Sequence, residues 1–494
     1  MSNLKVLFPA LDSVGAASTN NSRIQALLDA GGQVSLQGSG TCYVTGGLVM
    51  GDNTELIVPP SLTIRLAPGS NKVMLTSSAI RSSLAGGGAT VTVNWTSGID
   101  CPVVWTAHGM SVGEYVYLNG ANEGQFRGVF VVTNVADANN LTLRLWRTPT
   151  ANATGTCKAL RANKNITVSG GIWDHDDANN PSSLFPDCMA IVLGACGNLQ
   201  VNNVTIKRST KYCLWLAALN GFSVSNVYVP ETVSDVVKIY GPAAYGDVEN
   251  ISGVASGDDL LTLQPKEAAA FSQYNPYTWG DILNVRIRNV RSPKNGNYKI
   301  FAIYTDSTFI ADNIEVDGVH GQTSGVAVSL NQSLGSGQGV LGRISVNNIT
   351  AKAVYPCQVA NATIDALRLG INNTVVDTTG ANTNGNHIRI DTTAVVKRLG
   401  VQMRITDATY GASGAPSPIY VGGAVWQMDL TDVQGIWGSS TRFLSLSSTG
   451  GARVDKINFE GSTSTATTPS RSHRATRQPI RPRSCSDRAR KSRR

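Results

Sequence analysis

The feature of this sequence that most constrains its fold is a repeat in residues 199–265. Three successive units each contain an apolar pair, an asparagine, a second apolar run, a polar turn and a third apolar run. Their asparagines are Asn203, Asn226 and Asn250, which are 23 and 24 residues apart. One such unit cannot bury its apolar side chains alone, whereas stacked units pair their strands about 4.8 Å apart. The sequence therefore predicts an all-β chain folded as a parallel β-helix rather than a β-sandwich or a propeller.

Further copies of the repeat are centred on Asn289, Asn313 and Asn348. An asparagine at a fixed place in each coil can hydrogen-bond to its neighbours and support the bend of the chain. We therefore expect the asparagines of the first three copies to stack at one corner of the solenoid.

The segments beside the repeat predict a cap and an insertion. Ile24, Leu27 and Leu28 share one face of a short helix, which would cover the open end of the solenoid. Residues 86–160 contain strands joined by Gly and Asn turns but lack the repeat, which indicates a small inserted β domain. The predicted organisation is an N-terminal cap with the first coils at 1–85, the insert at 86–160, a central β-helix at 161–395, a C-terminal β-rich region at 396–462 and a basic tail at 463–494.

The net charge of +8 is concentrated at the end of the chain. Residues 469–494 contain ten Lys or Arg and one acid, so the remaining body carries about −1 and offers no general reason to bind nucleic acid. The tail lacks apolar periodicity and is expected to be disordered. The sequence has no apolar run of membrane-spanning length and no recognisable signal peptide, so we expect a protein made in a cytoplasm without membrane partners.

The sequence predicts neither a metal site nor a cofactor. The eight cysteines include no CxxC pair, and no Cys/His spacing fits zinc. Asp174, Asp176 and Asp177 lie close together but lack the spacing of a calcium loop, so they are interpreted as a turn.

A second group of acidic residues differs from this turn because the repeat brings its members together from neighbouring coils. Asp235 and Asp259 each lie nine residues after their repeat asparagines, and Asp258 lies eight residues after its own. These three catalytic candidates should therefore meet on neighbouring coils. Crowding raises the pKa of a carboxyl group, which would supply a proton donor. Diverging side chains would reach the roughly 6.5–9.5 Å separation of inverting glycosidases.

Outward-facing polar and aromatic residues near these acids predict a carbohydrate groove. Strand parity places Trp215 and Lys238 on the outer surface, so we expect an exposed tryptophan beside a lysine. The aromatic residues Tyr274, Tyr277 and Trp279 belong to a long loop that we expect to border the groove. The substrate-binding candidates are Trp215, Lys238, Lys266, Tyr298 and Lys299.

Several segments of the sequence resemble a known protein superfamily. The helix and first strands resemble the N-terminal cap of the pectate-lyase-like right-handed β-helix superfamily, and the inserted "HGMSVGEYVYLNG" segment resembles bacteriophage tailspikes. The acidic turn is similar to that of polygalacturonase-type glycoside hydrolases, with Gly257, Asp258 and Asp259 matching their Gly-Asp-Asp motif. The resemblance implies that Asp258 is the general acid and that Asp235 and Asp259 activate water. The family's Gly-His-Gly is absent, since the next coil offers Tyr298 and no histidine.

The resemblance implies a phage tailspike that hydrolyses a bacterial surface polysaccharide. It also implies a homotrimer located in the virion tail, with a phage tail or baseplate protein as partner and action at the host surface. Two alternatives remain open from the sequence. A polysaccharide lyase would take its base from Lys or Tyr residues beside the acids, and a non-catalytic adhesin would bind the glycan without cleaving it.

Overall fold

The structure is a computed structural model. The residues that it describes are 5–7, 13–84, 86–267, 272, 278–306, 308–332, 339–377, 385–405, 417–437, 443–448, 451–461 and 463–466. The predicted disorder of the tail beyond residue 466 and the predicted role of Tyr274 and Tyr277 lie outside these residues.

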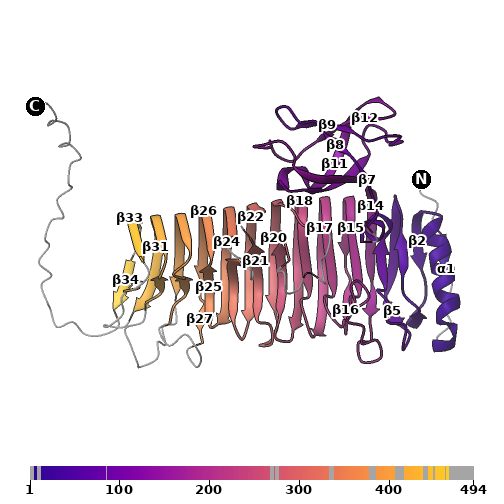
Figure 1. The fold of residues 1–494 in the computed structure, drawn as a ribbon. Coiled ribbons are helices and arrows are strands. Elements are labelled where there is room, and N and C mark those ends of the chain that lie inside the picture. The colour runs from indigo at the N-terminus through magenta and orange to yellow at the C-terminus, as the bar shows by residue number, and fades with distance from the viewer. Residues whose placement is uncertain are drawn as a thin grey trace, which may run out of the picture.

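The chain forms a right-handed parallel β-helix that carries a small second sheet on one side (Figure 1). The N-terminal strands of the β-helix are β1 (Lys5–Leu7), β2 (Gly32–Leu36), β3 (Gly40–Val44), β4 (Leu48–Met50), β5 (Thr54–Leu66) and β6 (Leu75–Ser77). The central strands are β14 (Asn163–Asp174), β15 (Ile191–Asn202), β16 (Thr205–Lys207), β17 (Leu214–Thr232), β18 (Val237–Ala255), β19 (Asp259–Gln264), β20 (Ile282–Ser292), β21 (Lys299–Thr305), β22 (Ile310–Gln322), β23 (Val326–Gln332), β24 (Gly339–Ala353), β25 (Tyr355–Ala360), β26 (Ala362–Asn372), β27 (Val375–Val376) and β28 (Ile388–Ile390). The C-terminal strands are β29 (Val395–Ile405), β30 (Ile419–Val421), β31 (Ala424–Trp437), β32 (Leu444–Leu446), β33 (Arg453–Glu460) and β34 (Thr463–Ala466).

The core of the β-helix consists of stacked columns of aliphatic side chains. Leu214, Val237 and Leu261 occupy equivalent positions on three successive coils and are fully buried. Since alternate residues of a strand point to opposite faces, one inward set suffices to build a continuous core. Burying each such side chain stabilises the fold by roughly 1.5–3 kcal/mol. A single coil could not bury these side chains without neighbouring coils on both sides.

The asparagine ladder predicted from the repeat is confirmed. The Asn226 side-chain amide donates a hydrogen bond to the Asn203 side-chain oxygen at 2.9 Å, and the Asn250 amide donates to Asn226 at 2.9 Å. Asn289 extends the ladder with a 2.7 Å bond to Asn250. All four residues have φ near +55°, in the left-handed region where asparagine is better tolerated than most residues.

The assignment of Asn313 to this ladder is wrong. The strand register places it opposite Asn284, to which its amide donates a hydrogen bond at 2.8 Å, at a neighbouring corner of the coil. Gly318 occupies the ladder position beside Asn289. The error arose because both corners need a left-handed backbone, which either asparagine or glycine can adopt.

Two substitutions of Asn226 should separate the stability contributed by its side-chain hydrogen bonds from that contributed by its tolerance of a left-handed backbone. Asn226→Gly loses the two side-chain hydrogen bonds and should cost about 1 kcal/mol of unfolding free energy. Asn226→Ala also forces a residue with a Cβ into the left-handed region, so its cost should be greater by about 1–2 kcal/mol. Urea unfolding of both variants measures this difference, and an alanine variant as stable as the glycine variant would contradict the backbone argument.

The N-terminal helix α1 (Ala17–Asp29) follows a 3₁₀ turn, η1 (Val14–Ala16), and covers the open end of the solenoid (Figure 1). Ile24 and Leu28 are buried against the first coils and Leu27 is partly buried, as the apolar spacing predicts. The cap therefore shields the first layer of the core from water.

The second sheet lies in the region where the sequence predicts an insert. Its seven strands pair antiparallel: β7 (Ala89–Thr90), β8 (Thr92–Val93), β9 (Asp100–Val104), β10 (Tyr115–Ala121), β11 (Gly128–Asp137), β12 (Asn140–Arg144) and β13 (Gly155–Arg161). A helix, α2 (Ser78–Leu84), precedes it, and a 3₁₀ turn, η2 (Gly124–Phe126), lies within it. Tyr117 and Val129 of this sheet pack on outward side chains of β15, β17 and β18, so the insert covers part of the β-helix surface.

The C-terminal strands continue the same parallel pairing. β29 pairs with β31 and β31 pairs with β33, so these strands continue the stack of parallel coils. Thr463–Ala466, which the sequence analysis places in the tail, pairs with Gln434–Trp437. Cys196 and Cys213 are buried free thiols, as expected of small apolar side chains. Among the described residues, no helix is long and apolar enough to cross a membrane.

Candidate active site

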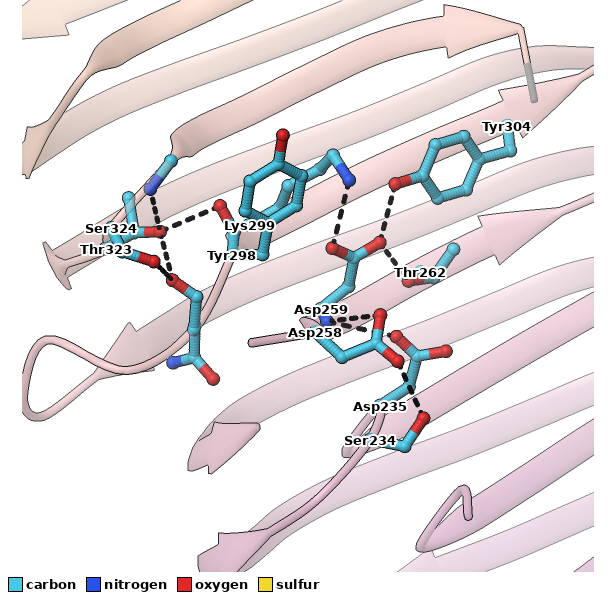
Figure 2. A network of polar contacts seen from close by, with 12 residues as sticks. Ser234, Asp235, Asp258, Asp259, Thr262, Tyr298, Lys299, Tyr304, Thr323 and Ser324 are labelled. Atoms are coloured by element: carbon cyan, nitrogen blue, oxygen red, sulfur yellow. Dashed lines mark hydrogen bonds and ion pairs between the residues drawn. The ribbon is translucent and has the colours of Figure 1, made fainter. Parts of the chain in front are cut away.

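The strand register brings Asp235, Asp258 and Asp259 together. Val237 pairs with Leu261, which places Asp235 opposite Asp259 on the next coil, and Asp259 in turn pairs with Lys299. The three carboxylates lie where the chain enters β18 and β19 and point toward one another (Figure 2). We refer to Asp235, Asp258 and Asp259 as the acidic cluster.

Asp235 is the most enclosed member of the acidic cluster, with 1% of its surface exposed. One carboxylate oxygen accepts a hydrogen bond from the Lys238 ammonium at 2.7 Å, and the other accepts the backbone N–H of Asp259 at 3.1 Å. Burial raises the pKa of Asp235 to about 8, although Lys238 acts in the opposite direction, and the charges of Asp258 and Asp259 raise it further.

Asp259 is also buried and has three polar partners. The Lys299 ammonium lies 3.2 Å from one carboxylate oxygen, and the Tyr304 hydroxyl donates to the other at 2.7 Å. The Thr262 hydroxyl reaches the same oxygen at 3.5 Å. Burial raises the pKa of Tyr304 well above its usual value and the negative charge of Asp259 adds to that effect, so this phenol remains a hydrogen-bond donor.

Asp258 is the one member of the cluster that is partly exposed. Its carboxylate accepts a hydrogen bond from the Ser234 hydroxyl at 2.7 Å and from the Asp259 backbone N–H at 3.2 Å (Figure 2). Gly257, at φ +81°, permits the tight turn that brings the Asp258 side chain to this place. A substrate arriving from solvent would therefore meet Asp258 before the other two carboxylates.

The charges of the site favour retention of one proton. Three carboxylates face two ammonium groups, those of Lys238 and Lys299, so full ionisation would leave one uncompensated negative charge in a buried site. Burial lowers the pKa of Lys238, but the charge of Asp235 outweighs it and holds that pKa well above its usual value. The lysine therefore stays charged, and the raised pKa of Asp235 lets that carboxyl group keep a proton at neutral pH.

The carboxylates converge rather than spread apart. One oxygen from each lies within 4.8 Å of the others, which is shorter than the separation of roughly 6.5–9.5 Å expected from the sequence. The side chains converge because Asp235 and Asp258 both accept the backbone N–H of Asp259. At this spacing a single water molecule could contact all three carboxylates.

The same spacing would suit a cation, but the two lysines already supply positive charge. A divalent ion would have to compete with the ammonium groups of Lys238 and Lys299 for the same oxygens. The donor set therefore fits acid–base chemistry better than metal binding.

The prediction that Trp215 is an exposed substrate-binding residue is wrong. Its side chain is fully buried and packs between Phe185 and Tyr240, with ring centroids 5.4 and 5.6 Å away. The apolar cluster around it includes Tyr117 and Val129 from the insert. Strand parity could not reveal this burial because the cover comes from residues far away in the sequence.

The other substrate-binding candidates divide into three environments. Lys238 and Lys299 are largely buried and ion-paired with the acidic cluster, so their positive charges partly compensate its negative charge. Tyr298 is 50% exposed, with the Lys299 ammonium 4.3 Å from its ring centroid, and remains available to a sugar. Lys266 pairs with Asp306 at 2.9 Å, and among the described residues no ion pair joins it to the acidic cluster.

Sequence reasoning missed several residues of the site. Tyr304 contacts the acidic cluster directly. The sequence feature that could have identified it is its position on the same strand as Lys299. Glu267, whose carboxylate accepts a hydrogen bond from the buried Tyr240 hydroxyl, lies beyond the end of β19, where the repeat gives no register. The Gln264 amide also donates to Glu267, at 2.7 Å.

The insert contacts residues of the β-helix near the acidic cluster's coils, including Trp279 and Phe309. The Arg127 guanidinium lies 6.0 Å from the Trp279 ring and 5.3 Å from the Phe309 ring. Arg147 of the insert forms an ion pair with the buried Asp281. The insert is therefore anchored to the coils that carry the site.

The other acidic group forms ion pairs within the fold. Asp174 is buried and accepts hydrogen bonds from both Arg65 and Arg208, and Asp176 pairs with Arg208 at 2.8 Å. Burial raises the pKa of Asp174, but the two arginines outweigh it and hold that pKa below its usual value. These carboxylates are charge partners of arginine.

Several solved structures of other proteins have a chain path similar to that of this protein. No protein-family model matches the sequence, and neither does any curated protein. The tailspike protein gp49 from Pseudomonas phage LKA1 is 12% identical, with 92% of this chain and 75% of that chain covered and a TM-score of 0.37. A polygalacturonase from Erwinia carotovora is 12% identical (94% and 96% covered, TM-score 0.41). PfbA, a surface adhesin of Streptococcus pneumoniae, is 14% identical (90% and 86% covered, TM-score 0.40). Tailspikes and polygalacturonases of the pectate-lyase-like β-helix fold, which the sequence resembles, are thus among the structures similar to this chain.

Proposed function

We propose that this chain is a glycoside hydrolase that cleaves a bacterial surface polysaccharide, and that it serves as a phage tailspike. The observation that carries the enzymatic part is the acidic cluster, in which three converging carboxylates face two ammonium groups. Together with the tailspike resemblance of the sequence, this proposal includes a homotrimer in the virion tail, attached to a phage tail or baseplate protein and acting at the host surface.

In the proposed reaction the proton that Asp235 holds at neutral pH passes to Asp258, one of whose carboxylate oxygens lies within 4.8 Å. Asp258 then donates it to the glycosidic oxygen as the bond to the anomeric carbon breaks. Water attacks that carbon, and its proton passes to the carboxylates of Asp235 and Asp259, so the cluster regains the proton it gave up. The partial exposure of Asp258 supports its role as donor, and the burial of the other two supports their role as the proton acceptor.

The lyase alternative needs an uncharged base near the substrate. Lys238 and Lys299 are both engaged by carboxylates, and the pKa of Lys238 lies above its usual value, because the charge of Asp235 outweighs the lowering effect of burial. An ammonium group in such an ion pair cannot accept a proton. The contacts therefore count against these two lysines and also against Lys266, which pairs with Asp306, so an elimination would need Tyr298 as its base.

Incubation with polysaccharides from candidate host strains tests the proposal. Mass spectrometry should detect shorter chains carrying ordinary reducing ends. Products with an unsaturated sugar, which absorbs in the near ultraviolet, would indicate a lyase instead. Binding without any shortening of the chains would indicate an adhesin.

The proposed function predicts a pH dependence. The carboxyl group of Asp235 has a pKa near 8 in the folded protein because of burial, against 3.8 for an ordinary aspartate. The folded chain therefore holds a proton that the unfolded chain releases, and the free energy of unfolding should fall as the pH rises from about 4 toward 8. Cleavage should likewise decline as the pH rises through about 8, where Asp235 loses the proton that Asp258 would receive. Rates and urea midpoints across this range measure both effects, and a rate that rises through pH 8 would contradict the acid role.

A further inference from the structure

A polar depression lies on the outer surface of the C-terminal coils and is lined by residues of β22, β24, β26, β29 and β31. It has a volume of about 520 Å³, and its lining includes Arg343, Arg368 and Arg398. An adjoining hollow of about 450 Å³ shares Arg398 and adds Trp426. We call this combined surface the basic groove. The acidic cluster, by contrast, lies at β18 and β19.

The strand register explains why the surface is hollow here. Ala366 lies opposite Arg343 on one side and Arg398 on the other, while Gly400 lies opposite Arg368. Small residues thus alternate with arginines on successive coils, about 4.8 Å apart. The long side chains stand beside gaps that another molecule can fill.

The charges of the basic groove are not balanced within the chain. Arg343 forms an ion pair with Asp312 at 3.3 Å, and Lys397 pairs with Asp365 at 2.6 Å. Arg368 and Arg398 are exposed, and within the described part of the chain neither has a carboxylate partner within 4.0 Å. The two guanidinium groups therefore remain available to an anion from outside.

The lining of the first hollow also contains two acidic residues, Glu315 and Asp429, and other side chains of the fold already contact both. The Asp429 carboxylate accepts hydrogen bonds from the Gln427 amide at 2.9 Å and from the Asn458 amide at 2.5 Å, and the Glu315 carboxylate lies 3.8 Å from the Arg286 guanidinium. An incoming carboxylate would thus meet arginines whose acidic neighbours already have partners.

An exposed aromatic ring completes the groove. Trp426 is 45% exposed, and the Lys397 ammonium lies 5.7 Å from its ring centroid. A tryptophan face offers a flat apolar surface for the C–H face of a sugar, and arginine matches the geometry of a carboxylate. We propose that the basic groove binds an acidic glycan segment whose charges are uronate carboxylates. This inference is independent of the proposed hydrolysis because it concerns other strands and a binding step.

Titration calorimetry of the full chain with a short oligogalacturonate tests the inference, with neutral dextran as the uncharged comparison. The wild-type chain should bind the uronate oligomer more tightly than dextran, and binding should weaken as salt is added. The double variant Arg368→Gln/Arg398→Gln should lose about tenfold or more in affinity, because charge-assisted hydrogen bonds disappear. Arg144→Gln is the matched control, since Arg144 is an exposed arginine of the insert that already pairs with Asp100. Its affinity should equal that of the wild type.

Several results would overturn the inference. These are a wild-type chain that does not bind the oligomer, a double variant that binds as well as the wild type, or equal affinity for dextran. A short DNA duplex bound as tightly as the oligomer would indicate a general anion surface. If the double variant instead changed the sedimentation of the protein, the groove would be a contact between copies of this chain. Trp426→Ala serves as a second probe with little risk to folding, and it should weaken uronate binding on its own.

Discussion

Asp258→Asn should reduce polysaccharide cleavage by at least about 10²-fold while glycan binding survives. The substitution keeps the shape of the side chain and removes the proton that the glycosidic oxygen would receive. The fold should persist, because two carboxylates then face two ammonium groups and the remaining charges balance. The Ser234 hydroxyl can still donate a hydrogen bond to the side-chain oxygen of the new amide. Initial rates of reducing-end formation, together with binding isotherms, measure the effect.

The matched control is Asp247→Asn, which removes an exposed acid from an outer surface of β18. Its cleavage rate should equal that of the wild type. If Asp258→Asn cleaved at the rate of this control, the acidic cluster would be a structural feature of the turn. If it lost binding as well as cleavage, Asp258 would hold the substrate rather than protonate it.

Trp215→Ala should destabilise the protein by about 3–5 kcal/mol, because it leaves a cavity beneath the insert. The ring is fully buried between Phe185 and Tyr240 and helps to join the insert to the β-helix. Trp215→Phe should cost less, since the indole N–H is buried without a hydrogen-bond partner among the described residues. Thermal and urea unfolding measure both effects.

Trp426→Ala provides the comparison for this prediction, because Trp426 is 45% exposed. It should change the unfolding free energy by no more than about 0.5 kcal/mol. A Trp215→Ala variant as stable as the wild type but weaker in glycan binding would restore the sequence-based interpretation of Trp215 as a ligand-binding residue.

The repeat made the architecture and the neighbourhood of the acids predictable. The spacing of Asn203, Asn226 and Asn250 reflects one coil of chain, so residues at equal offsets from them meet in space. Asp235 and Asp259 could therefore be aligned without any structure. The prediction failed for Asn313, where two corners of the coil favour the same residue type.

Contacts made by segments outside the repeat could not be predicted. The burial of Trp215 depends on Tyr117 and Val129, which belong to the insert. The repeat predicted where the carboxylates lie but not how their side chains turn, since that depends on Lys238 and Lys299, whose ion pairs cross the coil surface. Periodicity specifies the backbone positions of a solenoid, whereas the charge balance of its surface depends on individual side-chain rotamers.

The central claim is that the acidic cluster cleaves a glycan by adding water. Digestion of a host polysaccharide in water labelled with heavy oxygen tests it most directly, with mass spectrometry of the product ends. Hydrolysis predicts that each new reducing end carries one heavy oxygen and that Asp258→Asn yields almost no labelled product. Unlabelled ends that carry an unsaturated sugar, or no shortened chains with any host polysaccharide that the protein binds, would contradict the claim.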